Sequence, residues 1–575
     1  MNYREEFERW LAYGDLTAKE REMLVAMEND DNKQKMYFSA PMSFGTAGLR
    51  SEMELGPGGM NFYTVAQATQ GIANLVISEG GAERGVVIAH DSRNNSRYFA
   101  ETAATVMAAN NIKTYLFDGV RPTPELSFAV RELSCLAGIN ITASHNPKEY
   151  NGYKAYWEDG AQISPEQAAI VSSYISGIDV LGGFNLIDYE SAVSAGAIEL
   201  LGEDFDEKYL AAVMSTQINT EVIPAVADEL KIVYTPLHGA GYRMVPMIME
   251  RVGMKHLYTV DEQMTLDGNF PTVKKPNPEY AEVFSLGIEI AERVGSDLVI
   301  ATDPDSDRVG VMSRTSDGSF ATITGNQMGA LLLDYVIKAR REKGTLDKNS
   351  YCAKSIVSTE LASRIAEVNG VKLYDVLTGF KFIGEVIKKY ETNCLDGEFI
   401  FGFEESYGYL FGDYARDKDA VGATMMICEM TAYYKLKGMT LSDALEALYK
   451  EYGYYGDAVA DFYMEGLDGI EKRRAVMQNL RDMPPEKIGG SKVISIGDYS
   501  KGKITDLRTD ESVPTGTVLS DVLYYTLANG DKIIVRPSGT EPKIKMYFLS
   551  HAKSKDELLR KAELYRQDTA KFAEV

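Results

Sequence analysis

Gly85-Val-Val-Ile-Ala-His90 begins the stretch that decides the fold, which continues through Ile112-Lys-Thr-Tyr-Leu-Phe117 to Leu136-Ala-Gly-Ile-Asn-Ile-Thr142. These three short apolar runs have the composition of buried strands. The segments between them, residues 98–110 and 124–133, have the length and residue types of helices. Strands that alternate with helices in this way predict βαβ units around a largely parallel sheet.

The same alternation returns twice further along the chain. Leu230-Lys-Ile-Val-Tyr-Thr235 and Lys354-Ser-Ile-Val-Ser358 each begin a new block, and the blocks contain the later runs Asp297–Ala301 and Glu398–Gly402. The first 36 residues look helical instead, and within them Thr17 and Glu20 have the spacing of a helix-capping box. The last part also differs, since Asn529-Gly530 between two apolar runs predicts a hairpin, and residues 554–572 predict a charged helix. We therefore expect four domains, at residues 1–204, 205–322, 323–455 and 456–575.

The composition limits the classes of function. The chain has 575 residues, of which 45% are apolar and 25% charged, as in ordinary soluble globular proteins. Its formal net charge of −24 disfavours binding to nucleic acid or to an anionic membrane, and a phosphate ligand would need a local basic pocket. Four cysteines without a CxxC pair, no apolar signal core at the N-terminus and no apolar stretch near 18 residues predict a cytoplasmic protein.

Two loops that follow predicted strands carry groups for phosphate chemistry. Thr142-Ala-Ser144-His145-Asn146-Pro147 presents a hydroxyl beside an imidazole, although a capped turn explains the same residues on local grounds. Asp303-Pro-Asp305-Ser-Asp307-Arg308 places three carboxylates where they can bind one hard cation. A solvated acidic turn is the alternative, which the mutual repulsion of three carboxylates disfavours.

Two further loops match a sugar phosphate. Gly402-Phe-Glu404-Glu405-Ser406-Tyr407-Gly408 offers acceptors and a donor for sugar hydroxyls, or else a helix cap. Arg536-Pro-Ser538-Gly539-Thr540-Glu-Pro542 combines a guanidinium, two hydroxyls and a glycine, as in a phosphate nest, with Lys543 and Lys545 nearby. No Walker or GxGxxG motif is present, so the best signals for nucleotide binding are missing.

Together these four loops resemble the α-D-phosphohexomutase superfamily over nearly the whole chain. The segments 44–50, 90–93, 151–154, 236–239 and 378–381 also fit that family. The third loop and the length resemble its phosphoglucomutase branch, in the bacterial type related to the animal phosphoglucomutase-2 group. The resemblance implies three similar α/β domains with mixed sheets plus a C-terminal α+β TBP-like domain around a central cleft.

The resemblance also implies a reaction and a set of residues. Glucose 1-phosphate and glucose 6-phosphate would interconvert through a phosphoserine at Ser144 and a glucose 1,6-bisphosphate intermediate, which also acts as activator, with Mg²⁺ as the metal. The partners would be small-molecule sugar phosphates, without nucleic acid or membrane, and the enzyme a monomer or homodimer. The implied catalytic residues are Ser144, His145, Lys154 and Arg308, and the metal ligands are Ser144, Asp303, Asp305 and Asp307. Substrate contacts are expected from Arg50, His238, Lys381, Glu404, Ser406, Arg416, Arg536, Ser538, Gly539 and Thr540.

Several alternatives stay open at this point. Lys154 is the first choice of general base, because neighbouring cations can lower the pKa of a lysine, and His145 is the second. His238 could instead order its loop, and Arg416 could belong to a solvated charge cluster. Other members of the family act on mannose or pentose phosphates. From a different class, an aspartyl-phosphate phosphohydrolase would use Asp303 as nucleophile. A catalytically dead sugar-phosphate sensor is a further alternative, which the chemical completeness of all four loops disfavours.

Overall fold

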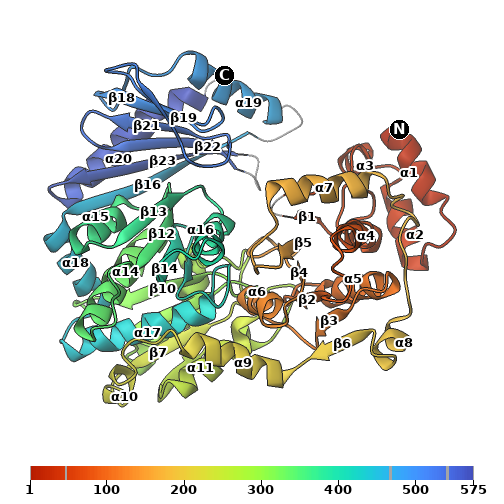
Figure 1. Cartoon of the computed structure of the whole chain (residues 1–575), viewed down its shortest axis with the longest axis horizontal. Coiled ribbons are helices and arrows are strands. Elements are labelled where there is room, and N and C mark those ends of the chain that lie inside the picture. Colours follow the sequence, from red (N-terminus) through yellow and green to blue (C-terminus); the bar gives the residue numbers. More distant parts are fainter. Residues whose placement is uncertain (1, 46–47, 465–468, 539–542, 574–575) are drawn as a thin grey trace.

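A computed structural model of the chain describes residues 2–45, 48–464, 469–538 and 543–573. In this part of the chain four sheets follow one another in sequence, and in Figure 1 the first lies on the right and the other three on the left, with the last at the top. Three of them combine parallel and antiparallel strands and are covered by helices, and the fourth is antiparallel. The predicted fold class is therefore confirmed, while the predicted domain limits stay a prediction.

The first sheet has the order β1-β5-β4-β2-β3-β6, in which β2, β3 and β4 are the three strands that the sequence predicts. Strand β5 runs antiparallel to β4 and carries Lys154. The strands are β1 (Leu49–Glu52), β2 (Val86–His90), β3 (Thr114–Phe117), β4 (Ala137–Ile141), β5 (Tyr150–Trp157) and β6 (Ile198–Leu201). The helices of this region are α4 (Phe62–Ser78), α5 (Ser96–Ala109), α6 (Thr123–Glu132), α7 (Pro165–Ser176) and α8 (Tyr189–Ser194).

Three short helices precede this sheet. They are α1 (Tyr3–Leu11), α2 (Ala18–Met27) and α3 (Asp31–Phe38). The predicted capping box is present at α2, where the Thr17 side chain accepts from the Glu20 amide and Glu20 accepts in return. Trp10 and Phe38 pack with Tyr63 of α4, so the helices form one cluster with the first domain.

The second sheet has the order β11-β10-β9-β7-β8. Its strands are β7 (Lys231–Thr235), β8 (His256–Thr259), β9 (Leu298–Thr302), β10 (Val309–Arg314) and β11 (Phe320–Ile323). The helices around it are α9 (Glu203–Met214), α10 (Val222–Ala225), α11 (Gly241–Arg251), α12 (Asp261–Met264) and α13 (Ser285–Val294), with a 3₁₀ turn at Ala281–Phe284. The loop with the three aspartates connects β9 to β10, which turns back antiparallel beside it.

The third sheet has the order β13-β12-β14-β15. Its strands are β12 (Tyr351–Ser355), β13 (Lys372–Val376), β14 (Phe399–Glu404) and β15 (Gly408–Leu410), and its helices are α14 (Gly325–Glu342), α15 (Glu360–Asn369), α16 (Lys381–Thr392), α17 (Ala420–Leu436) and α18 (Leu441–Tyr452). The strand predicted at residues 354–358 begins and ends three residues earlier. Ile356 and Val357 are apolar for another reason, since they pack against Tyr499 and Ile534 of the last domain.

The last sheet has the order β16-β23-β22-β21-β18-β19-β20, with β17 paired to β18. Its strands are β16 (Tyr454–Tyr463), β17 (Lys487–Ile488), β18 (Ser491–Asp498), β19 (Lys503–Asp506), β20 (Ser512–Pro514), β21 (Leu523–Leu527), β22 (Lys532–Pro537) and β23 (Lys543–Ala552), and its helices are α19 (Gly469–Asp482) and α20 (Lys555–Ala570), with a 3₁₀ turn at Lys571–Ala573. The predicted hairpin is β21–β22, and Gly530 in its turn has φ +86°, which glycine adopts without strain.

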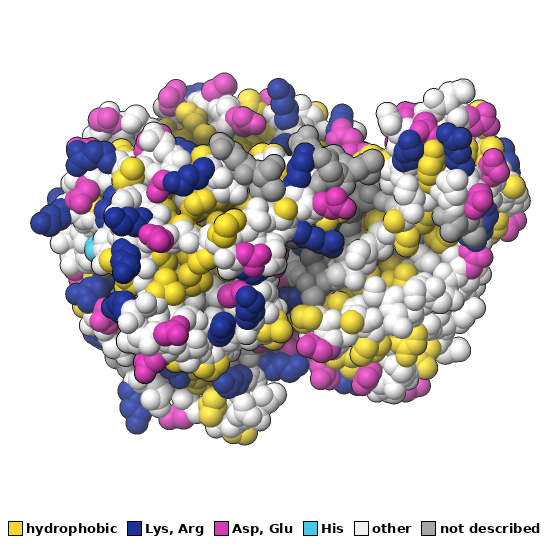
Figure 2. All heavy atoms as spheres, turned by 90° about the horizontal axis from the view of Figure 1, so that it is seen from above, with side chains coloured by type: hydrophobic (Ala, Val, Ile, Leu, Met, Phe, Trp, Pro, Cys, Tyr) yellow, Lys and Arg dark blue, Asp and Glu magenta, His cyan; other side chains and the backbone are white. Residues whose placement is uncertain are grey.

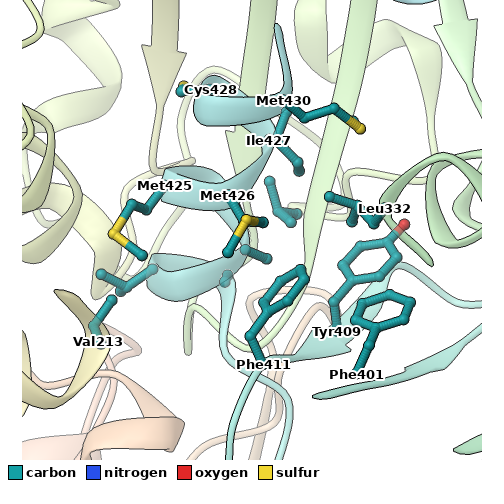
Figure 3. Close-up of a cluster of buried hydrophobic side chains, with 14 of the residues drawn as sticks. Val213, Leu332, Phe401, Tyr409, Phe411, Met425, Met426, Ile427, Cys428 and Met430 are labelled. Carbon is teal, nitrogen blue, oxygen red and sulfur yellow. The ribbon is translucent and has the colours of Figure 1, made fainter. Parts of the chain in front are cut away.

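One apolar core joins the first three domains. It runs from Phe117 in the first sheet through Ile300 in the second to Phe401 in the third. Figure 3 shows part of it, with Met425, Met426 and Ile427 of α17 in one cluster with Phe411 and with Val213 of α9. A shared core of this kind places the strand ends of three separate sheets relative to one another.

Cys135, Cys352 and Cys428 are buried free thiols, and Cys394 is exposed. Among the described residues, every helix is too short or too polar to span a bilayer.

Candidate active site

Ser144 lies at the end of β4, in a turn that leaves it a backbone conformation unusual for serine. Its φ is +53°, and its amide donates to Oγ1 of Thr142 at 2.8 Å. The hydroxyl donates to Oδ2 of Asp303 at 2.9 Å and lies 3.1 Å from Nδ1 of His145. Burial, and then the charges of nearby arginines, hold the pKa of His145 well below its ordinary value. The hydroxyl therefore lies between a carboxylate from another domain and a neutral imidazole.

Arginine side chains support this loop from behind. Arg93 is buried and donates to the carbonyl oxygen of Ser144 at 2.6 Å, and also to the carbonyl oxygens of Asn146, Pro147 and Tyr150. Asp91 lies against the same guanidinium, 3.3 Å from Nε. Arg50 of β1 donates to Oδ1 of Asn146 at 3.0 Å. Arg50 and Arg93, from two of the supporting segments, thus contact the serine loop.

Asp303, Asp305 and Asp307 come together in a buried turn after β9. One carboxylate oxygen from each lies within 4.8 Å of the others, and the exposed fraction of each residue is 2% or less. Oδ1 of Asp303 accepts from the backbone amides of Asp307 and Arg308, at 3.1 and 3.0 Å. Ser306 closes the turn with φ +52°. The backbone therefore fixes the directions of the carboxylates.

The charges of this cluster fit a hard divalent cation. Burial, and then the neighbouring carboxylates, raise the pKa of Asp303 well above its ordinary value. Burial alone would also raise the pKa of Asp305, but the ammonium group of Lys154 lowers it. Oδ1 of Asp305 and Oδ1 of Asp307 are buried and accept no hydrogen bond from a described residue. Three buried carboxylates, two of which have an unused oxygen, offer the oxygen ligands that a hard cation such as Mg²⁺ prefers.

Three cations surround the aspartates. Lys154 lies 2.7 Å from Asp305 and 3.5 Å from Asp307, Lys418 lies 3.2 Å from Asp307, and Nε of Arg308 lies 3.7 Å from Asp307. Lys418 is shared with Asp417, at 2.8 Å, so the cluster keeps its positive charge close to the carboxylates. A phosphoserine dianion and a divalent metal that are added together leave the net charge of the site unchanged. Burial alone would lower the pKa of Lys154, but the carboxylates raise it. The expected lowering of this pKa was therefore wrong.

A hydroxyl from the first domain also reaches the metal-loop carboxylates. Thr123, the first residue of α6, donates from its side chain to Oδ2 of Asp305 at 2.9 Å, and its amide donates to the Asp305 carbonyl at 2.8 Å. Asn140 of β4 donates to the Thr123 hydroxyl at 2.7 Å. The two domains are joined at the cluster itself.

The third loop approaches from β14. Glu404 ends this strand, and its Oε1 accepts from the amide of Gly379 at 2.6 Å. Burial raises the pKa of Glu404. The carbonyl oxygen of Ser406 accepts from Arg308 at 3.1 Å, so the metal loop and this loop touch.

Lys381 begins α16 and is available for an anion. Its Nζ lies 5.1 Å from the centre of the Phe382 ring, and no described carboxylate lies within ion-pair distance of it. Burial lowers the pKa of Lys381 to about 8. Lys381, and not Lys154, is therefore the lysine of this site with a lowered pKa.

The fourth loop begins in β22 of the last domain. Arg536 pairs with Lys545 in the antiparallel register, and the amide of Ser538 donates to the Lys543 carbonyl at 2.9 Å. The ammonium of Lys543 is engaged with Asp461 at 2.8 Å. Gly539 and Thr540 lie outside the described residues. Figure 2 shows a hollow between the N-terminal lobe and the rest of the molecule, with Lys and Arg side chains at its edge.

His238 and Arg416 are engaged inside the protein. The ring nitrogens of His238 lie 2.9 Å from the carbonyl of Thr265 and 2.9 Å from Oγ1 of Thr272, which fits the ordering alternative. Arg416 is fully buried, and its guanidinium donates to Glu391 and to nearby carbonyl oxygens. The alternative that placed Arg416 in a solvated charge cluster was therefore wrong.

Sequence reasoning missed Lys418, Thr123 and the role of Arg93. Lys418 is two residues after Arg416 in the same Ala-Arg-Asp-Lys-Asp run, and nothing local distinguishes the two cations. Lys418 alone of the two contacts the aspartates, because Asp417 and Asp307 flank its ammonium group at 2.8 and 3.2 Å.

The serine, the three aspartates and the surrounding cations form a site suited to phosphoryl transfer. Comparison with known families identifies the family. Residues 41–180, 207–318 and 324–452 match the phosphoglucomutase/phosphomannomutase alpha/beta/alpha domains I, II and III. The chain belongs to the phosphoglucomutase/phosphomannomutase family, within the α-D-phosphohexomutase superfamily. Among its relatives, the phosphoglucomutase of Staphylococcus aureus strain N315 is 36% identical over 546 residues, which are 93% of this chain and 96% of that protein.

Solved structures agree with the fold. Paramecium pp63/parafusin, a phosphoglucomutase, superposes with a TM-score of 0.69 at 17% identity, covering 93% of this chain and 96% of that one. The N-acetylphosphoglucosamine mutase of Aspergillus fumigatus, in complex with GlcNAc-6P and magnesium, gives a TM-score of 0.51 at 12% identity, covering 97% of this chain and all of that one.

Proposed function

We propose that this chain is a phosphoglucomutase that interconverts α-D-glucose 1-phosphate and glucose 6-phosphate. The observation that carries the proposal is the Ser144 hydroxyl, 2.9 Å from Asp303 within a buried trio of aspartates. A serine in this position can carry a phosphoryl group beside a metal ion, and the family membership supplies the reaction.

The reaction has two balanced transfers. In the first, a general base takes the O6 proton of glucose 1-phosphate, O6 bonds to phosphorus, the bond from phosphorus to Oγ of phospho-Ser144 breaks, and Oγ takes up a proton. Glucose 1,6-bisphosphate then reverses its orientation in the cleft. In the second, Oγ of Ser144 gives up its proton and bonds to the other phosphorus, the bond from that phosphorus to O1 breaks, O1 takes up a proton, and glucose 6-phosphate leaves. Phosphoryl transfer of this kind depends on placement and charge neutralisation more than on other covalent chemistry.

Residues of the chain divide this work. Asp303, Asp305 and Asp307, with phospho-Ser144, would hold Mg²⁺, which when bound neutralises charge on the transferring phosphoryl group. Lys154 and Arg308 orient the carboxylates and balance their charge. Lys154 is the general base that the sequence favours, but the carboxylates raise its pKa and keep it protonated, so His145, whose neutral ring lies 3.1 Å from Oγ, becomes the first candidate.

Other residues would bind the sugar phosphate. Glu404 and Ser406 supply acceptors and a hydroxyl for the ring, and Arg50 and Lys381 supply positive charge. Arg536 and Ser538, with Gly539 and Thr540, would hold the phosphate that is not being transferred. His238 and Arg416 bind groups of the protein, so their proposed role is to order their own segments.

The alternatives make different predictions. A phosphomannomutase or phosphopentomutase would prefer mannose or pentose phosphates in a competition assay. A phosphohydrolase would release inorganic phosphate and carry a covalent phosphate on Asp303. A sugar-phosphate sensor would bind without turnover. The proposed partners are sugar phosphates, and the proposed setting is a cytoplasmic monomer or homodimer.

The test uses Ser144→Ala with Ser134→Ala as the matched control. Ser134 also has a positive φ, of +54°, but it is exposed and lies after α6. We expect turnover of glucose 1-phosphate, with Mg²⁺ and a trace of glucose 1,6-bisphosphate, to vanish in the first variant and to stay unchanged in the second. Phosphopeptide mapping should find the phosphate on Ser144. A phosphate on Asp303, or full turnover by Ser144→Ala, would reject the proposal.

A further inference from the structure

A loop of the second domain covers the arginine that holds the serine loop. The ring of Phe270 lies 5.1 Å from the guanidinium carbon of Arg93, in cation–π geometry. Both side chains are buried, at 2% and 3% exposure. The contact joins a segment after α12 to a segment after β2, so it crosses between two domains.

Arg93 is the main support of the serine loop. Its guanidinium donates to four carbonyl oxygens, those of Ser144, Asn146, Pro147 and Tyr150. Ser144 has a positive φ, which costs free energy for serine and persists only when surrounding contacts impose it. A shift of the guanidinium would therefore move the hydroxyl that faces Asp303.

The covering loop is itself closely fitted. A Cβ at Gly268 would lie 2.2 Å from the amide nitrogen of Asn94, so backbone of one domain lies directly on backbone of the other. Asn94 donates to Oδ1 of Asn269 at 3.1 Å. Phe270 has φ +47°, in the left-handed region, as part of this fit.

His238 anchors the loop at its far side. Its ring bridges the carbonyl of Thr265 and the hydroxyl of Thr272, which flank Phe270. Gln263 donates to the same Thr272 hydroxyl at 2.9 Å. His238 thus holds the segment on both sides of Phe270, Phe270 contacts Arg93, and Arg93 holds the Ser144 loop.

We infer that Phe270 is a positioning residue, which holds Arg93 and through it the phosphoryl-carrying loop. The inference rests on the proposed function for its effect on turnover, but its effect on the loop does not. The aromatic face is the essential property, because a cation above a ring is attracted in a way that an aliphatic side chain of similar size cannot reproduce. Substrate phosphate is held elsewhere in the proposed site, so the step that suffers is transfer rather than binding.

The experiment compares Phe270→Leu and Phe270→Tyr with Phe320→Leu. Phe320 is the matched control, because it lies 4.5 Å from the guanidinium carbon of Arg314 in the same domain but at β11, away from the serine loop. Each full-length variant is measured for kcat and KM with glucose 1-phosphate, for its melting temperature, and for amide hydrogen exchange in residues 142–151.

Phe270→Leu is expected to lower kcat by about 10- to 100-fold, as small misplacements of a reacting group do, and to leave KM within about twofold. Its exchange in residues 142–151 should be faster than in the wild type. Phe270→Tyr should restore both values, and Phe320→Leu should change neither. Unchanged exchange in Phe270→Leu, or an equal loss in Phe270→Tyr, would overturn the inference. If the wild type fails to turn over glucose 1-phosphate, the proposed function falls, and the exchange comparison still decides the positioning role.

Discussion

Replacing Lys418 with methionine should damage catalysis far more than a matched loss of a buried charge elsewhere. Lys418 is 7% exposed, and its ammonium lies 3.2 Å from Oδ2 of Asp307 and 2.8 Å from Oδ1 of Asp417. At 3.2 Å and an effective dielectric constant of about 20, the first attraction is about 5 kcal/mol before desolvation is subtracted.

The net cost is smaller than this attraction. Removing one partner of a buried ion pair typically costs about 3–5 kcal/mol, because the other charge stays buried. Asp307 keeps Lys154 at 3.5 Å and Arg308 at 3.7 Å, so we expect about 3 kcal/mol. If this cost falls on the phosphorylated, metal-bound enzyme, kcat decreases by about 100-fold, since about 1.4 kcal/mol is a factor of ten.

Lys354→Met is the control for a general loss of stability. Lys354 is fully buried and pairs with Asp375 at 2.7 Å and Glu360 at 3.4 Å, on β12. Both variants should melt at lower temperature, but only Lys418→Met should lose turnover in the coupled assay at a temperature where both are folded. Lys418→Arg keeps the charge and should recover part of the rate. A kcat for Lys418→Met within about threefold of the wild type would refute the reasoning.

Three further predictions concern the metal, the phosphate and pH. Chelation with EDTA should stop turnover and Mg²⁺ should restore it, because Asp305 and Asp307 each have a buried carboxylate oxygen that accepts no hydrogen bond from a described residue. Full activity with no bound metal would contradict this. Arg536→Ala should lower kcat/KM in the forward and reverse directions alike, by about 10-fold or more for each charge-assisted bond lost at about 1.5–3 kcal/mol, and an unchanged value in both would show that this residue holds no substrate phosphate. Burial lowers the pKa of Lys381 to about 8, so its positive charge is present below pH 8 and is lost as pH rises through that value; kcat/KM should fall above pH 8, and Lys381→Arg should remove this decline in a pH profile. The same shift means that stability gains from this group as pH rises from about 8 toward the ordinary lysine value, because the unfolded chain then binds more protons than the folded one.

The site is built at the meeting of several sheets, which explains its sensitivity to contacts between domains. Thr123 of the first domain reaches Asp305 of the second, and Arg308 of the second reaches Ser406 of the third. The shared core beneath these loops keeps the strand ends in place. The last domain, which carries Arg536, joins the others through a smaller apolar cluster around Ile356 and Tyr499.

Local patterns in the sequence were sufficient for the strands, the turns and the loops that end them. The apolar run before Asp303 forms a buried strand, and the alternating carboxylates after it form the predicted cluster, because both depend on residues adjacent in the chain. The capping box at Thr17 and the Asn529-Gly530 hairpin are confirmed for the same reason.

Only the tertiary structure decided which carboxylate each cation contacts. Lys154 and Asp305 are 151 residues apart in sequence, yet 2.7 Å separates their charged atoms, and that contact reverses the expected shift of the lysine pKa. Arg416 and Lys418 stand two residues apart, yet one bonds to Glu391 and the other to Asp307. Coulomb energy and desolvation depend on distance and burial in three dimensions, and no local pattern of residues contains either quantity.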